Sequence, residues 1–318
     1  MKINPAEVAV IADGGGKRGC HSVGFLSGFI DHFKQPIFAD NKFYFQGSSV
    51  GALNLGFVAQ SLDVKGLIDI WEKKIQTGKI RVFNKRTAIR LLRRHRRNAI
   101  FDNADLFQLV SENLDVGKVV NSPVYLDIVV TNERNDNHIE FFSNRDLHSG
   151  NHQALIKKIC ASASLMGVFE PLEIGGGLYS DGLNFDIDRA IARGCTTIFL
   201  FHNNHIWLSP IIPSEKMDFQ RRGRRMSNIA WSRWVEIYLE LLLWRHPELE
   251  IVNHSYLPKP ISEVVKRIGL SGRGRLRLIV VGPQKIIPTL NIMTCLNGDA
   301  TRAIYEARDV FEKIVKQI

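Results

Sequence analysis

The sequence contains little cysteine and no long apolar run, and these two shortages exclude several classes of protein. Only 4 of its 318 residues are cysteine, and no two of them form a CxxC pair, which argues against a zinc site and against a disulfide framework. No window approaches the roughly 18 consecutive apolar residues that a membrane-spanning helix needs. The first apolar run follows a proline and a glutamate and ends at Asp13, so we expect no secretory signal and a cytoplasmic protein.

The composition is that of an ordinary globular protein with an excess of positive charge. Hydrophobic residues make up 45% of the chain and charged residues 23%, and 42 Lys and Arg against 32 Asp and Glu give a formal net charge of +10. These proportions argue against a disordered or fibrous protein. The positive charge favours an anionic partner, which is either a nucleic acid or a membrane surface.

Short apolar segments of strand length alternate with segments that can form helices. The segment Val8–Ala12 is followed by Asp13 and three glycines, as expected for a buried strand that enters a turn. Fully apolar strands that alternate with helices indicate an α/β protein whose sheet is covered on both faces. Further strands are expected at Phe43–Gln46, Val124–Val130, Ile139–Phe142, Thr197–Phe201 and Leu276–Val281.

No linker rich in Gly, Ser or Pro divides the sequence, so we expect residues 1–318 to form a single domain. The motifs described below lie within about residues 8–200. For residues 201–318 we expect an insertion that includes the loop-rich stretch His202–Ser227, then a final strand and a final helix. The segment Trp231–Trp244 is mostly aromatic and aliphatic, which is typical of a core helix; the alternative is a lid over the active site.

Three consecutive glycines follow the first strand, within the segment Gly14–Gly19. Glycine permits positive φ and leaves backbone N–H groups uncovered, and a helix that begins after the turn would favour a bound anion. Such a loop can bind a phosphate or the oxyanion of an acyl-transfer intermediate. The spacing Gly14-x-Gly16-x-x-Gly19 also matches a dinucleotide fingerprint, but no carboxylate ends the second strand to bind the ribose. A Walker loop is excluded because Gly-Lys-Ser/Thr does not follow.

A second glycine motif, Gly47-Ser48-Ser49-Val50-Gly51, follows the second expected strand and precedes a segment that can form a helix. This is the context of a nucleophile elbow, in which flanking glycines permit a sharp turn that exposes the hydroxyl of Ser49. The alternative is a turn rich in Gly and Ser that caps a helix. The strand–turn–helix context and the upstream Gly-rich loop favour a nucleophilic serine.

A serine nucleophile needs a base, and the sequence offers two arrangements. In the α/β-hydrolase order, a late histidine would follow the serine and an acid, but an elbow after only the second strand is early for that fold. The other candidate is Asp181, which ends a strand-like segment and precedes Gly182; by itself, an Asp-Gly step more often marks a hairpin turn. The late histidines are His202, His205, His246 and His254.

Taken together, these motifs resemble those of the patatin-like phospholipases. That family has a G-G-G-x-R/K-G loop, then G-x-S-x-G, then a distant D-G-G/A. This sequence has Gly14–Gly19, Gly47–Gly51 and Asp181-Gly182 in the same order, and the resemblance spans about Val8 to Gly194. It includes the segment Ala161-Ser162-Ala163-Ser164 and Pro171. Leu183 departs from the family, which usually has Gly or Ala there, so we expect crowding beside Asp181.

The resemblance implies a three-layer α/β/α sandwich with a central, mostly parallel sheet, and a Ser–Asp dyad without a catalytic histidine. In such a dyad Ser49 attacks a carboxylic ester and Asp181 accepts its proton. The implied activity is that of a lipid acyl hydrolase of the phospholipase A or lysophospholipase type, which uses no metal or other cofactor. The implied oxyanion hole comprises Gly14, Gly15, Gly16 and Arg18, with the N–H groups of Gly15 and Gly16 as donors.

Two segments carry the excess of positive charge. Lys79–Arg97 contains nine Lys or Arg and no acid, interleaved with apolar residues, and Arg221–Arg225 contains four more. For a lipid acyl hydrolase, we expect these segments to contact an anionic membrane surface. The alternatives are a soluble serine esterase acting on short esters, and a non-catalytic protein that binds nucleic acid or membranes on a hydrolase scaffold. The sequence contains no recognisable nucleic-acid-binding motif, so no nucleic acid is expected.

Overall fold

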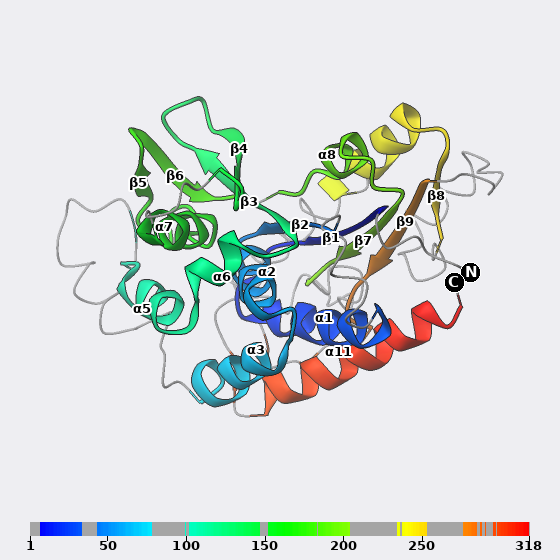
Figure 1. Ribbon diagram of the computed structural model, residues 1–318, viewed down its shortest axis with the longest axis horizontal. Coiled ribbons are helices and arrows are strands. Elements are labelled where there is room, and N and C mark those ends of the chain that lie inside the picture. Colours follow the sequence, from blue (N-terminus) through cyan, green and yellow to red (C-terminus); the bar gives the residue numbers. More distant parts are fainter. Residues whose placement is uncertain are drawn as a thin grey trace, which may run out of the picture.

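One mixed sheet of nine strands forms the centre of the part of the chain that the structure describes (Figure 1). The structure is a computed structural model, which describes residues 7–33, 43–77, 99, 102–146, 152–182, 184–203, 234–235, 237–252, 276–284, 287, 290, 295–296 and 298–317. The strand order is β5-β6-β3-β2-β1-β7-β9-β8, and β4 pairs with β3. The strands are β1 (Val8–Ala12), β2 (Tyr44–Ser48), β3 (Tyr125–Asn132), β4 (His138–Ser143), β5 (Leu172–Ile174), β6 (Gly177–Asp181), β7 (Thr197–Phe201), β8 (Leu249–Ile251) and β9 (Leu276–Val281).

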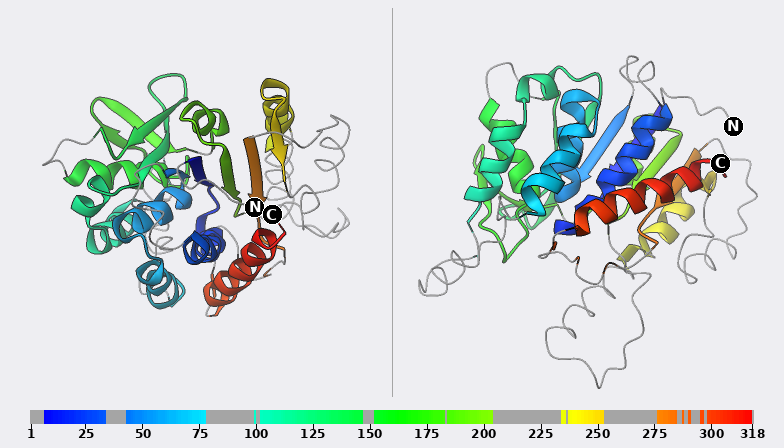
Figure 2. Two further views of the ribbon diagram at one scale, coloured as in Figure 1. Left: turned by 45° about the vertical axis from the view of Figure 1, so that its right-hand side comes forward. Right: turned by 90° about the horizontal axis from the view of Figure 1, so that it is seen from below.

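The six strands β3, β2, β1, β7, β9 and β8 are parallel, whereas β4, β5 and β6 join the sheet by antiparallel pairing. Helices lie on both faces (Figure 1, Figure 2). This arrangement confirms the predicted α/β/α fold with a mostly parallel sheet. The short helical elements are η2 (Gly16–Gly19), α3 (Lys65–Asp69), η4 (Ile70–Ile75), α6 (Val116–Val120) and α8 (Ile187–Ala192); the longer ones are α1 (Cys20–Phe33), α2 (Val50–Ser61), α5 (Ala104–Asn113), α7 (His152–Ser162) and α11 (Asp299–Val315).

Strand β1 explains why the central strands are apolar along their whole length. Its side chains alternate between the two hydrophobic cores: Val8 and Val10 belong to the core beneath α1 and α11, whereas Ala9 and Ile11 belong to the core beneath α8. Every residue of the strand is therefore buried, and no position on it tolerates a polar side chain without a partner.

The observed strands differ from the expected ones in the end of β2 and in two additional short strands. Strand β2 extends through Gly47 and Ser48, because Gly47 is paired with both β1 and β3. Strands β5 and β8 were not expected. Each is three residues long with a central glutamate, and so short a segment carries no readable alternation of apolar and polar residues.

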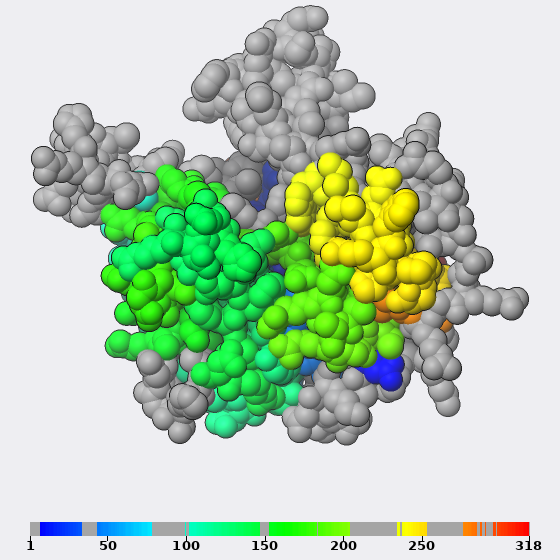
Figure 3. All heavy atoms as spheres, turned by 90° about the horizontal axis from the view of Figure 1, so that it is seen from above, coloured from blue at the N-terminus to red at the C-terminus, as the bar shows by residue number. Residues whose placement is uncertain are grey.

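A helix over residues 237–245 lies beside α8 on the face seen from above (Figure 3). Leu239, Leu242 and Leu243 are buried in the second core, which confirms the core prediction for one face of the Trp231–Trp244 segment. The other face is exposed: Leu241 is 54% and Trp244 79% accessible.

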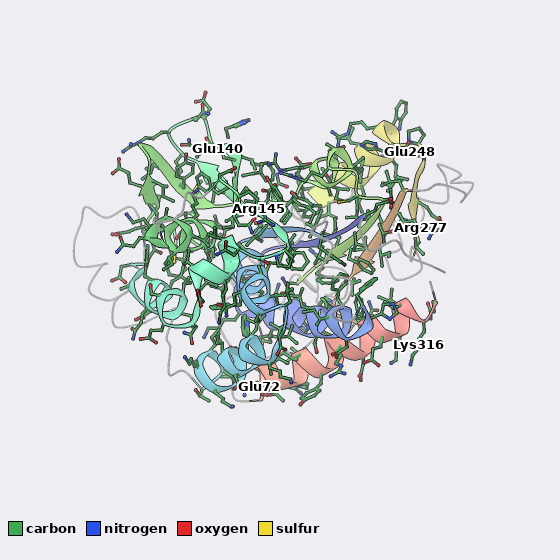
Figure 4. All side chains as sticks on the ribbon, in the orientation of Figure 1. Glu72, Glu140, Arg145, Glu248, Arg277 and Lys316 are labelled. Carbon is green, nitrogen blue, oxygen red and sulfur yellow. The ribbon has the colours of Figure 1, made fainter. Side chains whose placement is uncertain are left out.

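Charged side chains such as Glu248 and Lys316 lie at the outer edge of the molecule (Figure 4).

The cysteines do not form disulfides among the described residues, since all four are buried as free thiols. Within the described part of the chain, no helix is both long enough and apolar enough to cross a bilayer. The basic segments Lys79–Arg97 and Arg221–Arg225, and nearly all of the expected insertion His202–Ser227, lie outside the described residues.

Close packing of α1 against α11 leads to a stability prediction. A Cβ added at Gly24 would lie 2.1 Å from the carbonyl oxygen of Ile304 and 2.7 Å from Cβ of Ala307, so Gly24→Ala must push the two helices apart. Although alanine favours helices over glycine, we expect this overpacking to lower the free energy of unfolding by about 1–3 kcal/mol, measured by urea denaturation. Gly66→Ala in α3 is the control, because an added Cβ meets nothing within 4 Å there. Equal or higher stability of Gly24→Ala would contradict the prediction.

Candidate active site

Ser49 lies in a strained turn between β2 and α2. Its backbone has φ 56° and ψ −128°. Residues other than glycine rarely adopt this conformation, and those that do are found most often at functional sites. The flanking glycines make the turn possible: a Cβ added at Gly51 would lie 2.1 Å from the carbonyl oxygen of Ala12, and one at Gly47 2.4 Å from Cα of Ala52. The predicted Gly47–Gly51 segment therefore has the geometry of a nucleophile elbow.

The sheet brings Asp181 to the same edge as Ser49. Strand β4 pairs with β3 along Asp127–Asn132, so it occupies one side of β3 over these residues. The other side pairs first with β2, whose Ser48 is opposite Val129, and then with β6, whose Asp181 is opposite Val130. Since Val129 and Val130 are consecutive, the carboxyl ends of β2 and β6 meet head to head on β3. Asp181 is 1% and Ser49 9% exposed.

Two serines at the end of α7 hold both candidate residues by hydrogen bonds. The backbone N–H of Ser49 donates to Oγ of Ser162 at 3.0 Å, and that hydroxyl donates to the carbonyl oxygen of Val129 at 2.6 Å. The backbone N–H of Asp181 donates to the carbonyl oxygen of Ser164 at 2.9 Å. The Ala161–Ser164 segment, which belongs to the family resemblance, had no predicted role; the structure shows that it fixes the two strand ends relative to each other.

The Gly-rich loop packs directly on Ser49. A Cβ added at Gly14 would lie 3.0 Å from Cβ and 3.6 Å from Oγ of Ser49. Gly16 has φ 56°, a conformation that favours glycine. The loop therefore requires glycine at position 16 as well as at position 14. Helical turns follow it, first η2 and then α1, which gives the loop the position of an anion-binding turn.

A buried polar network supports this loop from below. The Asp13 carboxylate is bonded to Nδ1 of His202 and accepts the backbone N–H of Asn203 at 3.0 Å. The Asn203 side chain donates to the carbonyl oxygen of Asp13 at 2.8 Å and accepts the N–H of Ser22 at 2.9 Å. His202 therefore lies beneath the loop in contact with the Asp13 carboxylate. A side chain at Gly15 would strike Asn203, since an added Cβ would lie 2.8 Å from its Cβ.

Asn54 connects the loop to the helix that follows the elbow. Its amide donates to the carbonyl oxygen of Gly19 at 2.9 Å and to Oγ of Ser22 at 2.8 Å, and its side-chain oxygen accepts the indole N–H of Trp71 at 3.0 Å. Asn54 is fully buried, and these bonds fix the distance between η2, α2 and η4. This role of Asn54 could not be predicted from the sequence, because all three partners come from other segments.

A cavity of about 60 Å³ adjoins Ser49. Its wall is almost wholly apolar, as expected for a site that receives an acyl chain or another apolar group. The lining residues are Gly16, Lys17, Ser49, Val50, Leu53, Trp71, Ile75, Leu106, Leu109, Ala163 and Phe169.

The remaining predicted site residues are placed as follows. Gly14 lies against Ser49 and Gly16 lines the cavity, whereas Arg18 is half-buried and does not line it. Leu183, expected to crowd Asp181, lies outside the described residues; Gly182 instead contacts Val129, since its added Cβ would lie 2.3 Å from that carbonyl oxygen. Within the described ranges, no group of three or more His, Cys, Asp or Glu residues could hold a metal ion.

The family described as patatin-like phospholipase matches residues 10–191, which is more than half of the chain. No curated protein matches the sequence. Among solved structures, the chain is similar to VipD from Legionella pneumophila with 12% sequence identity and a TM-score of 0.45, over 98% of this chain and 67% of that one.

Proposed function

Because the chain belongs to the patatin-like phospholipase family, we propose that it is a lipid acyl hydrolase that cleaves carboxylic esters through Ser49 and Asp181. The observation that carries this proposal is the head-to-head meeting of β2 and β6 on β3. Ser48 and Asp181 are opposite consecutive residues of β3, so the elbow serine, which directly follows Ser48, and the buried aspartate come from the same place on the sheet. An apolar cavity adjoins Ser49.

In the proposed first half-reaction, Oγ of Ser49 attacks the ester carbonyl and the Asp181 carboxylate accepts the hydroxyl proton. The tetrahedral intermediate then collapses, the bond to the leaving alcohol breaks, and Asp181 returns the proton to that oxygen. The acyl group remains on Ser49. In the second half-reaction, water attacks the acyl carbonyl, gives its proton to Asp181, and Ser49 leaves and regains that proton.

The Gly-rich loop is the proposed oxyanion hole. Gly14 lies against Ser49, so the backbone N–H groups of Gly15 and Gly16 lie in the adjacent turn. Each donor to a developing oxyanion is typically worth about 10²–10³ in rate. Arg18, two residues after Gly16, completes the proposed electropositive environment.

The proposal is tested by hydrolysis of defined phospholipids by the wild type and by the Ser49→Ala and Asp181→Asn variants. Equal activity of all three proteins would overturn it. We further propose that the basic segments Lys79–Arg97 and Arg221–Arg225 bring the enzyme to an anionic membrane surface, for which flotation with vesicles with and without anionic lipid is the direct measurement.

The cavity wall distinguishes a lipid hydrolase from an esterase that acts on short esters. Leu106 of α5 lines the cavity, so Leu106→Trp should fill part of the space that an acyl chain enters. We expect kcat/KM for p-nitrophenyl palmitate to fall about tenfold more than kcat/KM for p-nitrophenyl butyrate. Leu106→Met, which nearly preserves volume, is the control. Equal losses toward the two esters would argue that long acyl chains do not bind in this cavity.

A further inference from the structure

Asn203 lies just beyond the end of β7, across β1 from the nucleophile elbow. Strand β1 lies between β2 and β7 (Figure 1) and is parallel to both. Its last residue, Ala12, is opposite Gly47 of β2 and Phe201 of β7. The Gly-rich loop that follows β1 therefore begins between two chain segments: the elbow that carries Ser49 and the segment that carries Asn203.

The side chain of Asn203 is bonded to both ends of this loop. Its amide donates to the carbonyl oxygen of Asp13 at 2.8 Å, and its oxygen accepts the N–H of Ser22 at 2.9 Å. The backbone N–H of Asn203 also donates to the Asp13 carboxylate at 3.0 Å. Asn203 is fully buried, where hydrogen bonds are stronger than in water. One side chain thus connects the residue before the loop to the helix after it.

These bonds fix the orientation of the first peptide group of the loop. The carbonyl group of Asp13 points toward Asn203, and this peptide is trans, so the N–H of Gly14 points the opposite way. Consecutive glycines then contact opposite neighbours. A Cβ added at Gly14 would lie 3.0 Å from Cβ of Ser49, whereas one added at Gly15 would lie 2.8 Å from Cβ of Asn203. The loop is therefore packed between the nucleophile and Asn203.

A loop of this composition needs such support to act as an oxyanion hole. Glycine has more backbone freedom than any other residue, so three consecutive glycines do not by themselves form a rigid turn. Donors stabilise a developing oxyanion only when they are already oriented before the reaction. The bonds and contacts of Asn203 restrict the movement of the loop at the residue before the first glycine and at Gly15.

We propose that Asn203 is a positioning residue for ester hydrolysis, which holds the backbone N–H groups of the Gly-rich loop in the orientation that receives the oxyanion. This inference rests on the proposed hydrolase function and adds a residue to it. Asn203 acts through the loop and takes no part in bond making or proton transfer. Its loss should slow the chemical step more than it weakens substrate binding, because the ester oxygen becomes an oxyanion only after attack.

The first test is hydrolysis of p-nitrophenyl butyrate by Asn203→Ala. We expect kcat to fall about 10- to 100-fold while KM changes less than about threefold, because a displaced donor should cost less than the 10²–10³ in rate typical of a donor that is removed. Asn203→Ser retains a hydroxyl group and part of the bonding. It should show a smaller loss of the same kind, and it replaces Asn203→Ala if that variant yields too little folded protein.

The second test is inhibition by an alkyl trifluoromethyl ketone. The Ser49 oxygen bonds to the ketone carbon, the hydroxyl proton passes to Asp181, and the carbonyl oxygen becomes an oxyanion. In Asn203→Ala the inhibition constant of the ketone should rise about tenfold or more. The inhibition constant of the corresponding secondary alcohol, which has the same chain but cannot form the adduct, should stay within about twofold of the wild type.

Asn144→Ala is the matched control. Asn144 is also fully buried, and its side chain likewise connects separate backbone segments. It donates to the carbonyl oxygens of Val119 and Val124 and accepts the N–H of Leu126, near the beginning of β3. Its loss should lower Tm about as much as Asn203→Ala does, but it should leave kcat and both inhibition constants unchanged. An equal fall in kcat in the two variants would overturn the inference, because it would reflect general destabilisation.

The inference and the hydrolase proposal fail by different results. A wild-type kcat in Asn203→Ala, or an equal loss of affinity for the ketone and the alcohol, would refute the role of Asn203 while Ser49 remained the nucleophile. Full hydrolytic activity of Ser49→Ala would refute the proposed function itself, whatever the effect of Asn203→Ala.

Discussion

Ser49→Ala is expected to lower kcat/KM for a phospholipid ester by at least about 10³-fold, because it removes the atom that would form the acyl-enzyme. The fold should be unaffected. The bond that anchors the turn runs from the backbone N–H of Ser49 to Ser162, and the substitution leaves it in place. Hydrolysis is measured by titration of the released fatty acid, and thermal unfolding of the same samples establishes that the variant is folded.

Ser48→Ala provides a control one residue away. Ser48 is 1% exposed, and its hydroxyl makes no hydrogen bond within the described part of the chain, so its removal should change activity by less than about threefold. A serine-reactive phosphonate should form one adduct with the wild type and with Ser48→Ala, and none with Ser49→Ala. Undiminished hydrolysis by Ser49→Ala would exclude Ser49 as the nucleophile.

Asp181→Asn should lower kcat/KM by about 10²–10⁴, the range typical for loss of a positioned general base. An asparagine has nearly the shape of aspartate but cannot accept the proton of Ser49. Two hydrogen bonds hold the backbone of this residue: its N–H donates to the carbonyl oxygen of Ser164 at 2.9 Å, and its carbonyl oxygen accepts the hydroxyl of Thr131 at 2.8 Å. The side chain at position 181 should therefore keep its place in the variant while losing the ability to accept a proton.

Two measurements make the Asp181→Asn result specific. Labelling of Ser49 by the phosphonate should slow in parallel with hydrolysis, since both need an activated hydroxyl. Asp136→Asn, a change of the same kind in the exposed turn between β3 and β4, should have no effect on either rate. If Asp181→Asn labelled and hydrolysed at the rate of the wild type, the base would have to be another residue.

The sequence was sufficient to predict the elements that form the middle of the sheet. Strands β1, β7 and β9 begin and end at the expected residues, because strands buried on both faces are apolar along their whole length. The positions of Ser49 and Asp181 at strand ends were likewise predicted from glycine motifs, whose local conformation depends on few neighbours.

The hydrogen bonds that hold the site in place could not be predicted, because they join residues far apart in the sequence. Asn203 lies 190 residues from Asp13, to which it is bonded, and Ser162 lies 113 residues from Ser49. Serine, asparagine and histidine at such positions carry no local pattern, since their roles depend on which segments the fold brings together. The short strands β5 and β8 were missed for a related reason: the neighbouring strand, and not the three-residue sequence, makes them strands.

The meeting of β2 and β6 on β3 divides the proposed dyad between two parts of the architecture. Ser49 belongs to the parallel centre of the sheet, whereas Asp181 comes from the β5–β6 hairpin, which is antiparallel and attached to β3 by only three residue pairs. The two cores of the centre do not depend on that hairpin for most of their side chains. In evolution, a descendant could therefore change or lose the hairpin and keep the scaffold. Such a protein would retain the apolar cavity and the serine but would lack the proposed base, so it could bind a lipid without cleaving it.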